Sequence, residues 1–108
     1  VEKCTVNSKN GLNFNNSENV TVDQCNVDVK GYAVRYGEGA SSAAGRAETY
    51  NITNSTLKSA CDDGDAVIIL RGSADNATLN ITNTTLEGDI KVTNNAVGAK
   101  VIIDGVEL

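Results

Sequence analysis

The chain has 108 residues, a formal net charge of −5 and a pI near 4.5, and it contains no His, Pro, Met or Trp. The absence of His excludes a Ser-His-Asp triad and any zinc site that depends on imidazole. Only nine Lys and Arg side chains are present, which argues against nucleic-acid binding, because that binding depends on clustered positive charge. No apolar run approaches the ~20 residues of a membrane-spanning helix, so no membrane span is expected.

Five short segments of the chain align with one another without gaps. Each reads aliphatic, polar, turn residue, small, polar, aliphatic, and the segments are Val1–Val6, Val22–Val27, Ile52–Leu57, Ile81–Leu86 and Ile103–Leu108. They begin at residues 1, 22, 52, 81 and 103, so the intervals are 21, 30, 29 and 22 residues. The two longer intervals are explained by a fixed unit of about 21 residues that has received a loop insertion.

A second set of apolar segments, each preceded by Gly, falls between these repeats. They are Gly11–Phe14, Gly31–Tyr36, Gly64–Leu70 and Gly88–Val92. Each unit therefore holds three short strands: one after a Gly, one before the turn residue and one after it. We predict a single all-β domain over residues 1–108, folded as a single-stranded parallel β-helix of four to five coils with two loop insertions.

The turn position of the repeats should form a column along this solenoid. It is occupied by Lys3, Gln24, Asn54, Asn83 and Gly105. Asn and Gly tolerate the left-handed conformation that a sharp turn between strands needs, and stacked Asn side chains can hydrogen-bond along the column. Lys and Gln fit this turn less well, so we expect the first two coils to bend differently.

The position after the turn residue is small in every repeat. It is occupied by Cys4, Cys25, Ser55, Thr84 and Val106. Cys4 and Cys25 lie one coil apart with parallel Cβ directions, which is a poor geometry for a disulfide. We predict that both are buried free thiols, while the third cysteine, Cys61, lies in a loop insertion.

This pattern resembles the right-handed parallel β-helix superfamily with the pectin-lyase-like fold, found in bacterial surface and secreted proteins. The resemblance covers essentially the whole chain. It implies a right-handed coil, which is also the general preference of parallel crossovers, and an extracellular or cell-surface location. It also implies that a ligand cleft lies against one sheet, between flanking loops. The superfamily mixes lyases, glycosidases and adhesins, so it indicates the fold rather than one function.

The two insertions, Gly37–Glu48 and Lys58–Asp65, border the same predicted sheet on adjacent coils. Residues expected to point outward on that sheet are Asn13, Ala33, Arg35, Val67, Ile69, Arg71 and Lys91. The candidate ligand-binding cleft consists of Arg35, Asp62, Asp63, Asp65 and Arg71. Tyr32, Tyr36 and Tyr50 are candidates for a sugar-stacking surface, although Tyr32 shares the inward position of Leu12, which favours core packing.

The three carboxylates of this cleft have alternative roles. The favoured role of Asp62, Asp63 and Asp65 is to stabilise an exposed turn, and no cofactor is then expected. The alternatives are that they bind Ca²⁺ or supply the acid and base of glycoside hydrolysis. The stretch 61–69 loosely resembles the Asp-Asp segment of polygalacturonase-type hydrolases, but the chain lacks the His-Gly and Arg-Ile-Lys motifs of that family. In lyases of this fold the base is an Arg or Lys, a role open to Arg35, Arg71 or Lys91.

The leading functional hypothesis is a non-catalytic structural or recognition module of an extracellular bacterial protein, binding a polysaccharide or host glycan in the manner of an adhesin. The alternative is a polysaccharide lyase or glycoside hydrolase that acts on an acidic polysaccharide. The segment begins at Val1 and stops at Leu108 in mid-coil. We therefore expect it to be a fragment of a longer solenoid, with its ends covered by further coils or by neighbouring subunits.

Overall fold

Short segments rich in Val, Ile and Thr form strands throughout the chain, because β-branched side chains favour extended backbone. The computed structural model describes residues 1–15, 19–37 and 48–108, and over these residues the protein is all-β. The remaining regular elements are two 3-10 turns, η1 (Asp62–Gly64) and η2 (Gly72–Ala74).

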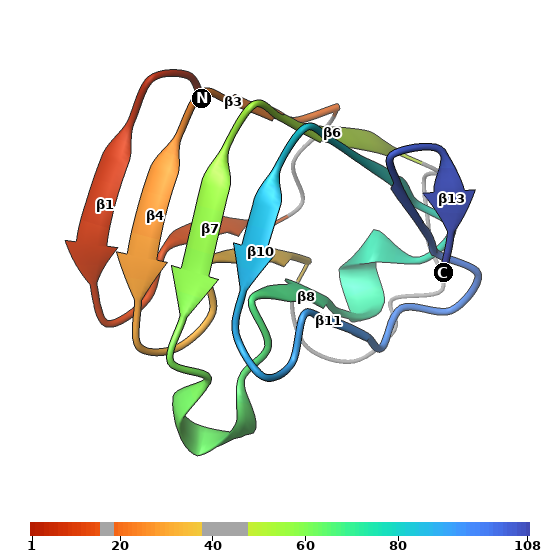
Figure 1. Cartoon of the computed structure of the whole chain (residues 1–108). Helices are drawn as coiled ribbons and strands as arrows, with labels where there is room; N and C mark the ends of the chain where they lie inside the picture. Colours follow the sequence, from red (N-terminus) through yellow and green to blue (C-terminus); the bar gives the residue numbers. More distant parts are fainter. Residues whose placement is uncertain (16–18, 38–47) are drawn as a thin grey trace.

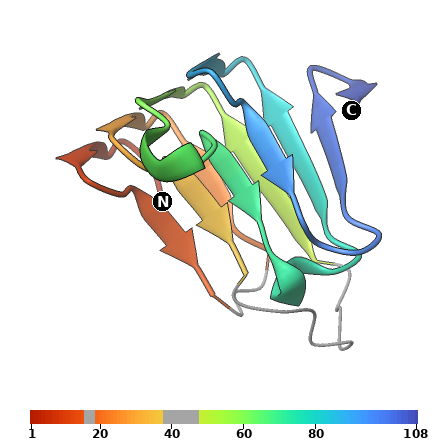
Figure 2. The same ribbon diagram turned by 90° about the horizontal axis from the view of Figure 1, so that it is seen from below.

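The strands form three sheets, which we name A, B and C (Figures 1 and 2). Sheet A contains β3 (Thr21–Asp23), β6 (Thr49–Thr53), β9 (Thr78–Thr82), β12 (Lys100–Ile103) and β13 (Val106–Glu107). Sheet B contains β1 (Thr5–Ser8), β4 (Asn26–Val29), β7 (Thr56–Ser59) and β10 (Thr85–Glu87). Sheet C contains β2 (Leu12–Phe14), β5 (Val34–Tyr36), β8 (Ile68–Leu70) and β11 (Val92–Asn94).

From β1 to β12 the chain visits sheets B, C and A in the same rotation, and we call one such passage a circuit. Each strand of one circuit pairs in parallel with the corresponding strand of the next, as β1, β4, β7 and β10 show in Figure 1. The register places Val22 beside Ile52 and Ile52 beside Ile81. The alignment predicted for the first four repeats is therefore confirmed.

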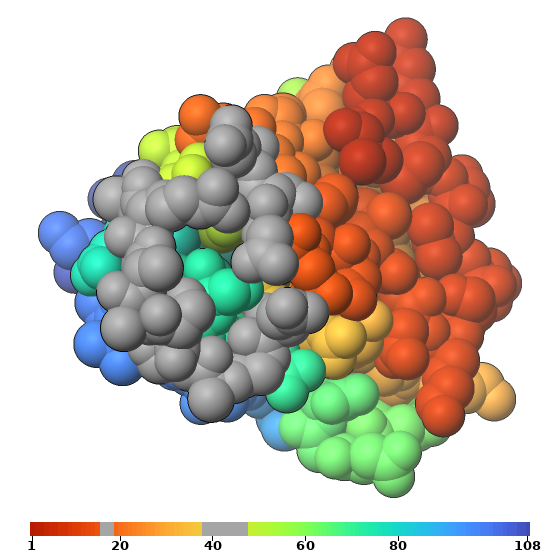
Figure 3. Space-filling view, turned by 180° about the vertical axis from the view of Figure 1, so that it is seen from behind, coloured from red at the N-terminus to blue at the C-terminus, as the bar shows by residue number. Residues whose placement is uncertain are grey.

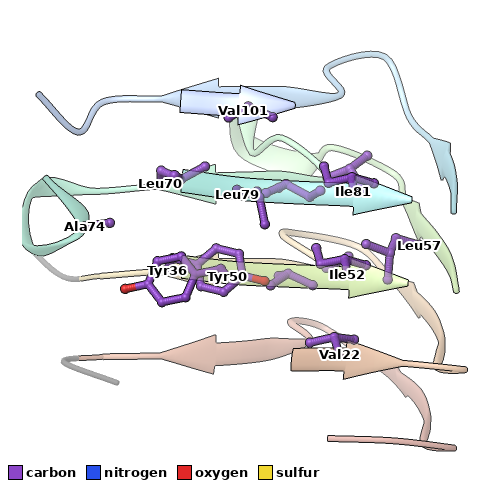
Figure 4. Close-up of a cluster of buried hydrophobic side chains, with 14 of the residues drawn as sticks. Val22, Tyr36, Tyr50, Ile52, Leu57, Leu70, Ala74, Leu79, Ile81 and Val101 are labelled. Carbon is purple, nitrogen blue, oxygen red and sulfur yellow. The ribbon is translucent and has the colours of Figure 1, made fainter. Parts of the chain in front are cut away.

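The aliphatic columns and the aromatic rings together form the core (Figure 4). Val22, Ile52 and Ile81 lie one above another and are at most 1% exposed. Beside them, the Tyr36 ring stacks on Phe14 and Tyr50, with centroid distances of 5.6 and 4.3 Å. Such stacks add to the hydrophobic stabilisation from area burial. Tyr36 and Tyr50 are thus interior residues, and the prediction that they form a sugar-stacking surface is wrong.

The corner between sheets A and B has the same backbone conformation in four circuits. Lys3, Gln24, Asn54 and Asn83 all lie in the left-handed region, with φ of 53°, 54°, 52° and 47°. The expectation that the first two coils bend differently is wrong, because interstrand hydrogen bonds impose the corner whatever the residue. As predicted, Asn side chains bond along the column, with Asn83 Nδ2 donating to Asn54 Oδ1 at 2.8 Å.

The fifth repeat departs from the predicted stacking. Asp104 and Gly105 have φ of 48° and 84°, and β13 runs back antiparallel to β12 with Ile103 opposite Val106. An Asp-Gly pair with two positive φ angles is the preferred two-residue hairpin turn. Val106 and Leu108 are therefore 67% and 71% exposed and do not extend the interior columns.

The entry into sheet C also differs from the prediction. Leu12 pairs with Val34, so Tyr32 does not share its position, and Ala33 and Val67 are fully buried rather than outward. The N–H groups of Ala33 and Val34 both donate to the Val67 carbonyl. This bulge-like corner turns two consecutive side chains toward the interior, which strict alternation of inward and outward residues does not allow for.

Candidate functional site

A cleft of about 930 Å³ lies where the strands of sheet B end and the chain turns toward sheet C. Its walls come from the ends of β1, β4 and β7, from the turns that follow them, from η1 and from β5. The lining residues are Asn7, Ser8, Lys9, Asn10, Asp28, Val29, Lys30, Gly31, Tyr32, Arg35, Lys58, Ser59, Ala60, Asp62, Asp63 and Asp65. Residues about 20 to 30 positions apart meet there because the parallel strands end at the same edge of the sheet.

Arg35 is held in place at one side of this cleft. It is the outward residue of β5, and its guanidinium carbon lies 4.5 Å from the centroid of the Tyr32 ring. Its Nε donates to Asn13 Oδ1 at 3.4 Å, and Asn13 is its register partner on β2. The cation–π contact and the hydrogen bond orient the guanidinium before any ligand arrives.

Two lysines occupy equivalent corners in successive circuits. The amides of Lys30 and Gly31 donate to the Lys9 carbonyl at 3.2 and 2.7 Å, and the amide of Asp62 donates to the Lys30 carbonyl at 2.8 Å. The side chains of Lys9 and Lys30 are exposed. The backbone at this corner is thus hydrogen-bonded from circuit to circuit, while both ammonium groups remain available to a ligand.

The outer face of sheet B contributes a column of polar residues to the same cleft. Asn7 pairs with Asp28, and Asp28 pairs with Lys58. Neighbouring residues on one sheet face are close enough for opposite charges to attract. Asp28 therefore partly compensates Lys58, and the cleft combines cationic groups with carboxylate and amide acceptors.

The segment η1 closes the opposite side and projects from the lower edge of the molecule (Figure 3, green). Cys61, Asp63 and Gly64 have φ of 56°, 59° and 80°, and the amide of Asp65 donates to the Asp62 carbonyl at 3.2 Å. The adjoining Ser59 is buried, and its hydroxyl donates to the Gly31 carbonyl. Ser59 Oγ also accepts from the amide of Cys61 at 2.8 Å, which ties η1 to the corner at Gly31.

Gly31 allows two polar side chains to approach the backbone of the cleft. A Cβ at this position would lie 2.2 Å from Asn10 Oδ1 and 3.0 Å from Asp65 Oδ2. Both atoms are ends of side chains, so a larger residue would displace them from the cleft. Asp65 is half-buried, whereas Asp62 and Asp63 are exposed. Of the three carboxylates in this segment, Asp65 is therefore the one fixed against the corner.

A second pocket of about 340 Å³ adjoins the first over the outer face of sheet C. It is lined by Arg35, Gly64, Asp65, Ala66, Ile69, Arg71, Thr93 and Asn95. Of the five residues predicted to form the cleft, Arg35, Asp62, Asp63 and Asp65 line the larger pocket, and Arg35, Asp65 and Arg71 line the smaller one. Arg35 and Asp65 are the residues that the two pockets share.

Several lining residues were not singled out from the sequence. Lys9 and Lys30 follow the second aliphatic residue of their repeats by three positions, and each precedes a Gly by one or two residues. Extending the repeat alignment by a few residues would have revealed these corner lysines. The sequence favours core packing for Tyr32, and the residue is 8% exposed, yet it also lines the cleft beneath Arg35.

Within the described residues, no three Asp, Glu, Cys or His side chains are gathered so as to hold a metal ion, and the calcium site stays a prediction. Residues 38–47 of the first insertion lie outside the described residues. No helix in the described part of the chain is both long and apolar enough to cross a bilayer.

Comparisons with protein-family models, with curated proteins and with solved structures find no match for this chain.

Proposed function

We propose that the protein is a non-catalytic carbohydrate-binding module that binds a polysaccharide carrying carboxylate groups in the larger cleft. The module belongs to an extracellular or cell-surface protein. The observation that carries this proposal is the arrangement of Arg35 over Tyr32 beside three lysines, in a cleft of about 930 Å³.

The charge of the cleft differs from that of the whole molecule. The chain carries a net charge of −5, yet four of its nine Lys and Arg side chains line this one cleft, namely Lys9, Lys30, Arg35 and Lys58. The same walls hold four carboxylates, those of Asp28, Asp62, Asp63 and Asp65, so the formal charge of the cleft is zero. The cleft is therefore less negative than the chain as a whole, and its four cations can pair with the charges of an anionic ligand. The carboxylates and amides in the same walls are acceptors for sugar hydroxyls.

Arg35 suits the carboxylate of an acidic sugar. A guanidinium binds a carboxylate through two parallel N–H···O bonds, and the buried Tyr32 ring supports the guanidinium from beneath. Because Tyr32 and Asn13 already hold Arg35, less side-chain entropy is lost when a ligand binds.

The fold that we propose is a right-handed parallel β-helix resembling the pectin-lyase-like superfamily. It is supported by the rotation of the chain through sheets B, C and A and by the parallel pairing of successive circuits. In that fold the outward faces of the sheets carry extended ligands. The cleft at the corner of sheets B and C and the pocket over sheet C form such a surface.

The alternative function is cleavage of the same class of polysaccharide by a lyase or hydrolase. Arg35 and Asp65 favour it, because both line the two adjoining pockets and would serve as base and acid or as metal ligand. The absence of His removes the most common general base. For this reason binding without cleavage is the stronger proposal.

The test is calorimetric titration of the purified protein with oligosaccharides from pectin, alginate and hyaluronan, and with neutral dextran oligosaccharides. We expect binding of at least one acidic series, and a loss of about tenfold or more in affinity for Arg35→Ala, since a bidentate contact disappears. Lys100→Gln, at the exposed first residue of β12 and outside the lining of the cleft, is the control and should bind like the wild type.

Two outcomes would overturn the proposal. One is the absence of binding to every acidic series, and the other is equal affinity of wild type and Arg35→Ala. The absorbance of unsaturated sugar products, followed with and without Ca²⁺, distinguishes a binding module from a lyase. Product formation that is lost in Arg35→Ala would replace the binding module by a lyase.

A further inference from the structure

Cys4 and Cys25 face each other across the first two circuits, outside the cleft. The amide of Lys3 donates to the Asp23 carbonyl, and the amide of Asn26 donates to the Cys4 carbonyl, both at 2.9 Å. Thr5 pairs with Asn26 in the same register. Cys4 is therefore the direct neighbour of Cys25, and adjacent strands are spaced about 4.8 Å apart, within the Cα separations that disulfides span.

The two thiols are free and in close contact. Cys4 Sγ lies 2.8 Å from Cys25 Sγ, and a disulfide bond is about 2.05 Å long. The sequence alone favours parallel Cβ directions and a poor bridge, but the left-handed corner at Lys3 and Gln24 comes immediately before both cysteines. The corner turns both side chains toward the same interior slot, where the sulfurs meet.

In the following circuits the same column holds hydroxyl groups. Ser55 Oγ accepts from the amide of Cys25 at 3.1 Å, and Thr84 Oγ1 accepts from the amide of Ser55 at 3.3 Å. Each of these hydroxyls also donates to a carbonyl two residues earlier. A polar side chain of this size is thus accommodated in the column, which makes Cys→Ser a suitable substitution for testing the thiols.

We propose that Cys4 and Cys25 are an oxidation site, and that a disulfide between them fastens the first circuit to the second. The first circuit gains most from this bond, because Cys4 and Val6 are only partly buried and Val1 is 53% exposed. The extracellular location proposed above would supply the oxidising conditions that such bonds require. The bond itself does not depend on what the cleft binds.

The chemistry is a thiol–disulfide exchange with a small disulfide oxidant such as glutathione disulfide. The Cys4 thiolate attacks one sulfur of the oxidant, which forms a mixed disulfide and releases the first glutathione thiol. Cys25 then loses its proton and attacks Cys4 Sγ, so that the Cys4–Cys25 bond forms and the second glutathione leaves. Two protein thiols are oxidised, and one oxidant disulfide is reduced to two thiols.

The partial exposure of Cys4 provides access for the oxidant, whereas Cys25 is 2% exposed. Burial, together with the neighbouring Cys25, raises the pKa of the Cys4 thiol to about 11. Because the thiolate is the attacking species, the rate of oxidation should rise steadily from neutral pH toward pH ~10.

The experiment oxidises native protein with glutathione disulfide and counts the remaining thiols by alkylation and intact mass. Cys61→Ser removes the third cysteine, so that only the proposed pair remains. We expect Cys61→Ser to lose the mass of two hydrogen atoms and both alkylatable thiols, and peptide mapping to join Cys4 to Cys25. Oxidised Cys61→Ser should melt roughly 10 °C above its reduced form, since a 21-residue loop is closed.

The matched controls are Cys4→Ser and Cys25→Ser, which should show no intramolecular cross-link and no change in melting temperature on oxidation. The proposal is overturned if Cys61→Ser keeps two alkylatable thiols, or if it stops at a glutathione adduct on Cys4. It is equally overturned if the cross-link forms but the oxidised protein melts no higher than the reduced one.

Discussion

Tyr36 has its hydroxyl group in the protein interior. The residue is fully buried between Phe14 and Tyr50, and no hydrogen bond to this oxygen is found among the described residues. Burial and the nearby Tyr50 raise the pKa of Tyr36 far above its usual range. The ring contributes to the core, whereas the hydroxyl carries a desolvation cost.

Replacing Tyr36 with Phe should therefore stabilise the protein. We expect the free energy of unfolding to rise by ~1 kcal/mol, because the buried hydroxyl is removed while the stacked ring stays. Urea unfolding followed by circular dichroism measures the change. Tyr36→Leu is the control and should destabilise, since it also removes the ring contacts. A Phe variant less stable than the wild type would show that the hydroxyl has a stabilising partner.

Asp23 is the charged residue with the best-defined partners in sheet A. Its Oδ1 accepts from Thr53 Oγ1 at 2.7 Å and from Asn54 Nδ2 at 3.0 Å. These hydrogen bonds lower the pKa of the Asp23 carboxyl below its usual value of 3.8. The stabilisation from the ionised carboxylate is therefore present above that value and is lost as the pH falls through the folded-state pKa.

The dependence of the melting temperature on pH below neutrality tests this contact. We expect Asp23→Asn to melt below the wild type near neutral pH, and the difference between the two to shrink once the pH falls below the usual pKa of 3.8. Thr53→Val removes one of the two side-chain hydrogen-bond donors to Asp23 and should show a weaker pH dependence than the wild type. Parallel melting curves with a constant offset from pH 2 to 7 would contradict the assignment.

At the scale of elements, the left-handed corner is what repeats from circuit to circuit. Asn54 and Asn83 suit it, since Asn tolerates positive φ and their side chains bond along the column. Lys3 and Gln24 adopt the same conformation without that advantage. The corner is therefore imposed by the strand pairing on either side, and residue choice only adjusts its cost.

This account predicts opposite effects for two corner substitutions. Asn83→Ala should cost about 1–2 kcal/mol of unfolding free energy, because it loses the hydrogen bond to Asn54 and strains the left-handed backbone. Gln24→Gly should gain about 0.5–1 kcal/mol, because relief of strain exceeds the added chain entropy of Gly. Denaturant titrations of both variants measure these changes in unfolding free energy. If both variants are stabilised, or both are destabilised, the explanation is wrong.

At the scale of the whole molecule, charge is distributed unevenly over an acidic protein. The cleft brings Lys9, Lys30, Lys58 and Arg35 together, although the net charge is −5. The lysines meet because β1, β4 and β7 lie side by side in sheet B (Figure 1), and Arg35 joins them from β5 of sheet C. Four carboxylates line the same cleft, so it is formally neutral in a chain of net charge −5, and an anionic ligand meets less repulsion there than elsewhere on the molecule.

Affinity for an acidic oligosaccharide should accordingly fall with salt. We expect a loss of about tenfold between roughly 0.05 and 0.5 M NaCl, since ions screen exposed charges within a few ångströms at the higher concentration. Calorimetric titration at several salt concentrations gives the slope of log affinity against log salt concentration, and this slope should be shallower for Arg35→Ala. An affinity independent of salt would show that the lysines and Arg35 do not contact the ligand's charge.

The sequence by itself determined which residues are vertical neighbours in the first four circuits. Val22, Ile52 and Ile81 could be aligned because a repeating unit must place equivalent aliphatic residues in one buried column. The pattern that marks each of these positions lies within a few neighbouring residues of the sequence. The same reasoning found Arg35, Asp65 and Arg71 around one sheet. Strands can be predicted from the sequence wherever buried and exposed residues alternate regularly along the chain.

Only the tertiary structure decided what happens where that alternation stops. The bulge-like corner that buries Ala33 and Val67 and the approach of Lys30 to Lys9 depend on backbone hydrogen bonds between circuits. The hairpin that exposes Val106 depends on hydrogen bonds between the consecutive strands β12 and β13. Their donors and acceptors lie about 20 to 30 residues apart or at a turn of positive φ. Turns set the direction of side chains through backbone angles, and residue type constrains those angles only weakly.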